Sequence, residues 1–419
     1  MDKPFDIAVI GGGPAGMIAA GRAAEIGARV ALVEKNARPG RKLLLTGNGR
    51  CNMTNHSEGL RKLVEKYGRK GKFLYHAFSV FGVEETVEFF RRRGLGTKVE
   101  ENGRVFPVTD RSSDVLGVLL RYMTEGGVKV VSDSAADGLD ASGGIITGVR
   151  LAGAVINANC FIICTGGKSF PKTGSSGEAY GWLKGLGHRI EPPAPALAPI
   201  TVKETWLRDM EGASLKDAGI TIYKDGKKKA SFRGEAVVTS SGLSGPVALD
   251  MSGLVGELLK GGEVALTVDL RPDIPASSTE GWFLRFFTEN QNRLLKNVIT
   301  EIVPPKVSGS ILELSGLDGE MQLNKVSRAG RLKLTGLVKG LPLTVKGLGG
   351  FDRAMVTRGG VSLKEIDPMT MRSKLFGNLY LAGELIDIDG PTGGYNLQAC
   401  WSTGYLAGES AGRAVKASR

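Results

Sequence analysis

The chain has 419 residues, of which 42% are hydrophobic and 23% charged, and its formal net charge is +12. That length is too great for one ordinary core and predicts two or three domains, while the composition excludes a fibrous or disordered chain. The 4 cysteines form no C-x-x-C pair and there are only 3 histidines. These counts argue against a disulfide scaffold and a histidine-rich metal site, so we expect no metal.

The first residues lead directly into a strand pattern, and no apolar run is long enough to cross a bilayer. We therefore expect a cytoplasmic protein without a membrane span. Basic clusters lie at 91–93, 227–229 and 325–333. Because no aromatic side chains alternate with them, solvated surface is the favoured interpretation, and the positive charge keeps nucleic-acid binding open as the less favoured one.

Residues 5–34 have the pattern of a complete dinucleotide-binding segment. A buried strand is expected at 7–10, a helix to about residue 26, and a second strand at 29–33 that ends at Glu34. The glycines of the intervening G-x-G-x-x-G turn are Gly11, Gly13 and Gly16. They permit a tight turn, the approach of a pyrophosphate and close helix packing, and a carboxylate at the second strand end accepts hydrogen bonds from ribose hydroxyls. The pattern predicts a site for an ADP half.

A glycine-rich polar loop over residues 40–55 follows this segment. Arg41 and Lys42 can neutralise pyrophosphate charge. Four further side chains can donate hydrogen bonds to the edge of a heterocycle: Asn48, Asn52, Thr54 and Asn55. Loops held by a rigid scaffold commonly carry ligands, which favours a binding role over a plain surface loop.

The next elements alternate between helix and strand. Helical patterns are expected at 84–93, 114–125 and 176–186, and strands at 128–131, 145–151 and 154–163. A proline cluster at 192–199 then marks a domain exit. Beyond it, residues 200–270 alternate in β fashion, residues 280–301 look helical, and a strand at 376–381 precedes a last helix.

This order predicts an α/β fold in which a Rossmann-like domain is built from both chain ends and interrupted by a mixed insertion. The expected boundaries are 1–193 for the first part, 194–353 for the insertion and 354–419 for the second part. Within the insertion, 194–270 and 330–353 are expected to be β-rich and 271–329 helical.

Two later segments complete the candidate site. Thr165, Gly166 and Gly167 end a buried strand, where backbone can approach a ligand. Glu384 stands just past another strand, where its carboxylate could accept hydrogen bonds from sugar-alcohol hydroxyls. Residues 394–397 open the last helix, and its amides could stabilise negative charge on a reduced flavin ring.

On these motifs the sequence resembles the YhiN/BaiN-like flavoprotein family, also called the aminoacetone oxidase family of FAD-binding enzymes, within the FAD superfamily typified by glutathione reductase. The matching stretches span nearly the whole chain; they are GRKLLLTGNGRCNMTN at 40–55, NGRVFP at 102–107, CTGGKSFPKTGSSGEAYGWLKGLGH at 164–188, GLSGP at 242–246 and the run from 356 to 408. Relatives usually carry Thr-His before Gly-Leu-Ser-Gly-Pro, whereas this chain has Thr239-Ser240. A proton-handling role of that histidine would be vacant or moved here.

The resemblance implies FAD as the cofactor, held by residues from both chain ends. Those residues are Gly11, Gly13, Pro14, Ala15, Gly16, Glu34, Lys35, Arg41, Lys42, Thr46, Gly49, Arg50, Asn52, Ala136, Thr165, Gly166, Gly167, Gly383, Glu384, Gly394, Asn396 and Leu397.

No residue is named as the catalytic base. Cys51 lacks a partner cysteine nearby in sequence, which favours a packing role, and His188 is expected to cap a helix end. His56 is the better-placed histidine. Tyr395 could contact the flavin or support the turn. Arg104 could hold an anionic substrate or pair with a neighbouring acid, Glu100 or Glu101.

The sequence thus predicts an FAD-dependent oxidoreductase acting on a small organic substrate, by amine oxidation or by reduction of a conjugated enone. NAD(P)H is a candidate electron donor, taken up transiently because no second nucleotide-binding motif follows a strand. The alternative is an RNA-binding flavoprotein that uses a basic insertion, as in tRNA-modifying flavoenzymes. The oligomeric state stays open.

Overall fold

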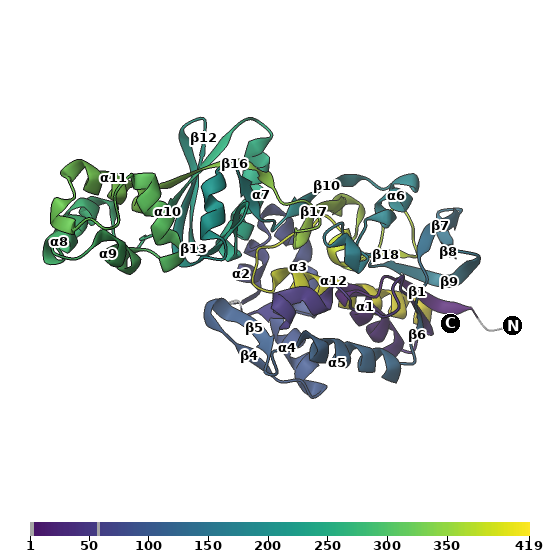
Figure 1. Cartoon of the computed structure of the whole chain (residues 1–419). Helices are drawn as coiled ribbons and strands as arrows, with labels where there is room; N and C mark the ends of the chain where they lie inside the picture. Colours follow the sequence, from purple (N-terminus) through teal and green to yellow (C-terminus); the bar gives the residue numbers. More distant parts are fainter. Residues whose placement is uncertain (1–3, 57–58) are drawn as a thin grey trace. The chain divides into compact units, whose positions relative to one another are not determined.

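The computed structural model describes residues 4–56 and 59–419. The chain forms two compact units, one from residues up to 195 together with 355–419, the other from residues 196–354. In Figure 1 the second unit is the teal-to-green part of the chain, and both chain ends belong to the first. The predicted α/β fold, with a Rossmann-like domain assembled from both chain ends, is confirmed.

The first unit is built on a mostly parallel sheet in the order β6-β2-β1-β9-β8-β7. Strand β9 is long, so that its first half pairs with β8 and its last residues pair with β18. The innermost strands are apolar on both faces, as expected where helices cover both sides. The strands are β1 Phe5–Ile10, β2 Val30–Val33, β6 Lys129–Val131, β7 Ala136–Ser142, β8 Ile145–Leu151, β9 Ala154–Ile163 and β18 Leu379–Leu381.

Helices α1 and α12 pack against each other beside β1 (Figure 1). Their closeness depends on small residues, because a Cβ on Gly404 would lie 2.4 Å from the carbonyl oxygen of Ala15 and one on Gly408 2.3 Å from that of Ala19. The first and last helices of the chain are thereby joined into one layer. The helices of this unit are α1 Pro14–Glu25, α2 Gly59–Glu65, α3 Gly71–Val80, α4 Val83–Arg92, α5 Ser112–Glu125, α6 Glu178–Gly185 and α12 Tyr395–Ala417.

Two small sheets complete the first unit. One is antiparallel, in the order β3-β5-β4, and holds the end of the polar loop. The other joins β10 to β17, next to the chain positions where the insertion leaves and returns. Their strands are β3 Thr54–Asn55, β4 Thr97–Val99, β5 Arg104–Pro107, β10 Ile190–Ala196 and β17 Val356–Val361.

The second unit contains a closed six-stranded barrel in the order β11-β14-β13-β12-β15-β16. Alternate side chains of its strands fill the interior, so the alternating pattern over 200–270 reflects a barrel wall. The strands are β11 Ile200–Val202, β12 Ser214–Lys224, β13 Lys227–Thr239, β14 Gly242–Ser244, β15 Val264–Asp269 and β16 Leu341–Leu348.

Five helices belong to this unit. The helix α7 interrupts the stretch expected to be β-rich, and the helical stretch over 280–301 is two helices separated by a turn. The helices are α7 Pro246–Leu259, α8 Thr279–Glu289, α9 Leu295–Ile302, α10 Pro305–Ser315 and α11 Arg328–Lys339.

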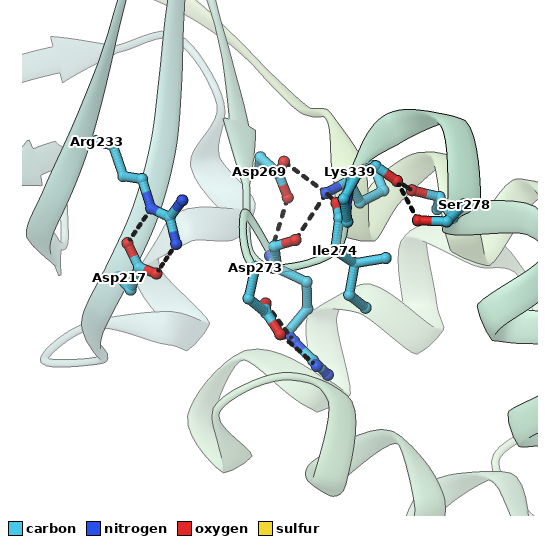
Figure 2. Close-up of polar contacts among 10 residues, drawn as sticks. Asp217, Arg233, Asp269, Asp273, Ile274, Ser278 and Lys339 are labelled. Atoms are coloured by element: carbon cyan, nitrogen blue, oxygen red, sulfur yellow. Dashed lines mark hydrogen bonds and ion pairs between the residues drawn. The ribbon is translucent and has the colours of Figure 1, made fainter.

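A half-buried lysine fixes the helical part to the barrel. The ammonium of Lys339, at the end of α11, donates to the carbonyl oxygens of Arg271 and Ile274 at 2.7 Å each and lies 2.7 Å from Asp269 Oδ2 at the end of β15 (Figure 2). All three of its protons therefore have acceptors, and the segment after β15 is held to α11.

Candidate functional site

The predicted binding residues gather at one edge of the parallel sheet. Strands β1, β2, β9 and β18 run parallel, so their carboxyl ends lie at the same edge. The glycine turn, Glu34, Thr165 and Glu384 each follow one of these strands. Ligands of open α/β sheets bind outside this edge, which makes it the candidate site.

Each glycine of the first turn has its own geometric reason. Gly11 has φ +101°, and a Cβ there would lie 2.5 Å from the carbonyl oxygen of Cys164. A Cβ on Gly16 would lie 1.8 Å from the carbonyl oxygen of Gly11. Around Gly13, in contrast, no heavy atom of the described residues lies within 4 Å of the Cβ position. The backbone is thus packed on both sides of Gly13 and open at it, where a pyrophosphate would approach.

Helix α1 starts at this opening. Gly13 is its N-cap, Pro14 is its first residue, and Ala15 follows in the first turn. The first amides of a helix have no acceptor within the helix, and the positive end of its dipole favours an anion. No acidic side chain stands in this first turn to compete for the position.

Glu34 is buried and held in a fixed orientation. Its Oε2 accepts a hydrogen bond from the amide of Gly12 at 2.8 Å, and its Oε1 accepts from the amide and the side chain of Asn36 at 2.7 and 2.6 Å. The amide of Ser134 donates to the carbonyl of Glu34, which brings the segment leading to Ala136 beside it. Each carboxylate oxygen can accept more than one hydrogen bond, so ribose hydroxyls can still bind.

Two basic residues of the predicted set lie at the periphery. The Lys35 ammonium binds Ser176 Oγ at 2.7 Å and Glu178 Oε1 at 2.5 Å. Arg41 is exposed and reaches the side chain of Asn36 at 3.3 Å. Both cations stand near the Glu34 end of the edge, with Arg41 free to move toward a phosphate.

Lys42 and Glu384 form the central polar contact of the site. The Lys42 ammonium lies 2.7 Å from Glu384 Oε2 and donates to Ser169 Oγ at 2.6 Å. Glu384 Oε1 accepts from Ser169 Oγ at 2.7 Å and from the amide of Thr357 at 2.9 Å. This network joins the polar loop to the ends of β9, β17 and β18. Ser169 and Thr357 were missed by sequence reasoning, although both lie within matching stretches, at 164–188 and 356–408.

The segment after β9 comes close to the same carboxylate. A Cβ on Gly167 would lie 2.3 Å from Thr357 Oγ1 and 2.8 Å from Glu384 Oε1, and Gly166 has φ +76°. Only glycine fits at Gly167 without displacing this network.

Two buried polar atoms at this edge lack partners. Within residues 4–56 and 59–419, Thr165 Oγ1 and Asn52 Oδ1 are buried and make no hydrogen bond. A buried hydroxyl and amide oxygen without partners are costly, and a polar ligand would satisfy them. Together with the opening at Gly13 and the fixed Glu34, they fit a long dinucleotide such as FAD lying along the strand ends.

Part of the polar loop is open toward the candidate site, and other residues of the loop make contacts within the protein. Thr46 Oγ1 donates to the carbonyl of Leu43 at 2.7 Å, and the Gly49 backbone has open space around it. The Arg50 guanidinium stacks 4.0 Å from the Phe106 ring and binds the carboxylates of Glu100 and Asp110. The side chain of Arg50 is therefore committed to the β3-β5-β4 sheet.

Cys51 is a packing residue. It is fully buried, and burial raises the pKa of its thiol to about 12, against a weaker opposing hydrogen bond from Thr46. A protonated buried thiol is a poor nucleophile. Its backbone has φ +63°, and its amide donates to the carbonyl of Thr46, so Cys51 shapes the loop.

Helix α12 begins at the far end of the site. Gly394 is its N-cap with φ +98°, and a Cβ there would lie 2.4 Å from the carbonyl oxygen of Thr54. The side chain of Asn396 accepts from the amide of Gly390 at 2.9 Å and donates to the carbonyls of Gly390 and Pro391. Asn396 thus fixes the preceding loop, and only the helix amides up to Leu397 remain for a ligand. Gly383, with φ +73°, packs against Ala15 of α1.

The side chains of β3 are used within the protein. Thr54 Oγ1 donates to Gln398 Oε1 at 2.5 Å, and Asn55 Nδ2 donates to the carbonyls of Asn102 and Gly393 at 3.1 and 3.0 Å. Both residues are buried. The expectation that they face a heterocycle edge is wrong, because these side chains anchor the start of α12.

Tyr395 supports the turn. It is buried, its carbonyl accepts from Tyr67 Oη at 2.6 Å, and the two rings meet edge to face. The amide of His188 donates to the carbonyl of Leu183 at the end of α6, but its ring does not cap the helix, since it lies buried between Glu365 Oε2 and Ser373 Oγ, each at 3.1 Å. Burial lowers the pKa of His188, against an opposing hydrogen bond from Glu365, which favours the neutral ring. His56 is exposed, and no hydrogen bond or ion pair with the described residues fixes its side chain toward the site.

The profile of the HI0933-like protein Rossmann domain matches residues 5–410. The 3-dehydro-bile acid delta(4,6)-reductase of Clostridium scindens is 33% identical over 97% of this chain and 98% of its own length. The ribosomal RNA dihydrouridine synthase of Escherichia coli K12 is 26% identical over 97% of each chain.

Solved structures share the fold at low sequence identity. The 3-ketosteroid-delta4-(5alpha)-dehydrogenase of Rhodococcus jostii RHA1 superposes with a TM-score of 0.53 at 16% identity, over 98% of this chain and 97% of its own. An open flavocytochrome c3 fumarate reductase gives the same TM-score and identity over 99% of this chain and 79% of its own. In the part of the chain that the structure describes, no helix is long and apolar enough to cross a membrane.

Proposed function

The chain belongs to the HI0933-like family of FAD-binding Rossmann proteins, and from this premise we propose that it reduces a carbon–carbon double bond conjugated to a carbonyl group. It is an FAD-dependent oxidoreductase acting on a small organic substrate. The sequence left amine oxidation and enone reduction open, and the proposal chooses reduction.

One observation carries this choice. Two relatives that match nearly the whole chain are named for saturating a double bond, in a 3-dehydro-bile acid and in a uridine of ribosomal RNA. In both molecules a C=C bond conjugated to a C=O group can accept a hydride at its β carbon. The proposal extends this shared chemistry to the present chain.

Bound FAD would supply the two-electron transfer, and the protein would supply position and electrostatics. Glu34 would hold the adenosine ribose, the start of α1 would bind pyrophosphate, and Glu384 would accept hydrogen bonds from ribityl hydroxyls. The amides at the start of α12 would stabilise negative charge that develops on the reduced ring.

NAD(P)H is the proposed electron donor. Reduction of a double bond needs an external source of two electrons, and the chain has one G-x-G-x-x-G turn following a strand. We infer that the nicotinamide nucleotide binds transiently and leaves before the substrate is reduced, as in a ping-pong mechanism.

A double bond carried on RNA is the second candidate, because two curated relatives are named ribosomal RNA dihydrouridine synthase. The charge distribution does not support the basic insertion foreseen from the sequence. Residues 196–354 carry 21 lysines and arginines against 18 acids, whereas the rest of the chain carries 34 against 25. RNA affinity that falls steeply with salt would favour this candidate.

A substrate screen with product analysis tests the proposal. Purified holoenzyme with NADH or NADPH is offered conjugated enones and dienones, the corresponding saturated ketones and primary amines. The expected result is donor consumption with enones alone and a product two hydrogen atoms heavier. Oxidation of amines without any enone reduction would contradict the proposal.

A further inference from the structure

Strands β3 and β5 bring Arg104 next to the start of α12. Asn55 and Arg104 are directly opposite in this antiparallel pair, so their side chains leave the same face of the sheet. The Asn55 side chain on that face reaches the carbonyl of Gly393, which directly precedes the N-cap of α12. Arg104 is therefore a neighbour of the helix start at which the reactive end of the cofactor is proposed to lie.

The guanidinium of Arg104 is short of partners. The residue is half-buried, and its Nε is buried with no hydrogen-bond acceptor among the described residues. No carboxylate of the described residues lies within ion-pair distance of it. A partly desolvated cation with an unsatisfied N–H is costly to keep, so the position calls for an acceptor from outside the protein.

Glu100, one of the two acids that could have neutralised Arg104, is engaged elsewhere. The Glu100 carboxylate binds Arg50, with Lys98 at 3.9 Å on the other side. The Arg50 hydrogen bond is the main cause that lowers the pKa of Glu100, with a smaller Coulombic contribution from Arg104. Of the two pairings foreseen as the simpler role of Arg104, the one with Glu100 is therefore not formed, and the side chain of Glu101 lies outside the described part of the chain. Among the side chains that the structure describes, Arg104 thus has no counter-ion within ion-pair distance.

We propose that Arg104 donates a hydrogen bond to the carbonyl oxygen of the conjugated substrate, an inference that rests on the proposed function. When a hydride joins the β carbon, the C=C electrons move toward the carbonyl and leave negative charge on its oxygen. The guanidinium stabilises that charge, and the α carbon then takes a proton from water. Two electrons and one proton arrive with the hydride, whose source is NAD(P)H, and the second proton comes from solvent.

Flavin reduction by NAD(P)H and flavin reoxidation by the enone, measured separately, distinguish this role of Arg104 from a structural one. Arg104→Gln removes the charge, Arg104→Lys restores it, and Arg111→Gln removes an exposed charge on the loop after β5 as a matched control. The expected result for Arg104→Gln is normal flavin reduction by NAD(P)H and reoxidation by enone slowed about 10²–10³-fold, as for loss of one donor to a developing oxyanion. Arg104→Lys recovers part of this loss, and Arg111→Gln matches the wild type.

Two measurements besides turnover complete the test. Titration of oxidised holoenzyme with the saturated ketone, followed by the flavin absorbance, gives a weaker Kd for Arg104→Gln, while the flavin reduction potential stays that of the wild type. A lowered potential, or equal slowing of both half-reactions, would place Arg104 on the flavin and overturn the inference. Wild-type rates in Arg104→Gln would overturn it too and leave the proposed function intact. Failure of every enone to reoxidise the wild type would overturn both.

Discussion

Lys42 and Glu384 form an ion pair of 2.7 Å across 342 residues of sequence. Both side chains are mostly buried, at 21% and 15% exposure, and Ser169 hydrogen-bonds to both of them. The pair joins the loop after the first nucleotide-binding strands to the end of β18. The two ends of the chain therefore meet at a charged contact placed at the candidate site.

The first prediction concerns this pair. Lys42→Met and Glu384→Gln, alone and together, should show a coupling of about 1–3 kcal/mol in unfolding of the holoenzyme, because each partner stabilises a poorly solvated charge. Urea denaturation measures it. The exposed pair Lys35–Glu178 serves as the control and should couple by only about 0.2–1 kcal/mol. Equal coupling in both pairs would mean that the central pair has no special role.

Gly394→Ala should disturb the start of α12. The new Cβ would stand 2.4 Å from the Thr54 carbonyl oxygen, at a φ of +98° that costs an L-residue about 1–2 kcal/mol. We expect a lower flavin reduction potential and slower reduction, with FAD still held through its ADP half. Gly377→Ala, a glycine with open space around it, is the control and should change neither. An unchanged potential in the first variant would show that this helix start does not tune the flavin.

Cys51→Ser should leave flavin reduction within about threefold of the wild type, since a buried thiol with a pKa near 12 is not ionised at neutral pH. Stopped-flow reduction with NAD(P)H checks the rate. In addition, the folded wild type should resist alkylation at Cys51 that the urea-unfolded chain undergoes. Loss of a charge-transfer band in the variant would be contrary to this account.

His188 should make stability depend on pH. Burial lowers its pKa in the folded state, whereas the unfolded chain binds a proton near pH 6.5. Below that pH the unfolded state holds the extra proton, so stability falls as pH drops through about 6.5 toward the folded pKa. Between pH 7.5 and 5.5, the Tm of His188→Asn should depend less steeply on pH than that of the wild type, because about one proton fewer is taken up on unfolding. An identical slope in both proteins would refute the assignment.

Local motifs could be predicted from the sequence because they depend on residues that are close together in the chain. The glycine turn and Glu34 follow from residue type and spacing, and each lies at the sheet edge where a ligand is expected. Even Gly394 could be singled out, because a glycine-rich turn precedes the last helix that the sequence predicts.

Contacts between distant segments could not be foreseen. Nothing near Lys42 in sequence indicates Glu384 as its partner. Nothing near Asn55 indicates that its side-chain amide donates to the carbonyl of Gly393. The resemblance placed Arg50 among the FAD-binding residues, and nothing near it in sequence indicated that Glu100 and Asp110 would bind its guanidinium. Helix α7 was missed because its apolar residues could not be separated from the alternating strand pattern over 200–270. Pro246, at its first position, was nevertheless a helix-start signal.

A single-turnover experiment tests the central claim most directly. The holoenzyme is reduced anaerobically with one equivalent of NADPH and mixed with one equivalent of a conjugated 3-oxo steroid enone or with its saturated ketone. The account predicts that the enone alone restores the oxidised flavin spectrum and is converted to one equivalent of product carrying two added hydrogen atoms. A reduced flavin that persists with every conjugated enone, yet is formed from an amine in place of NADPH, would contradict it.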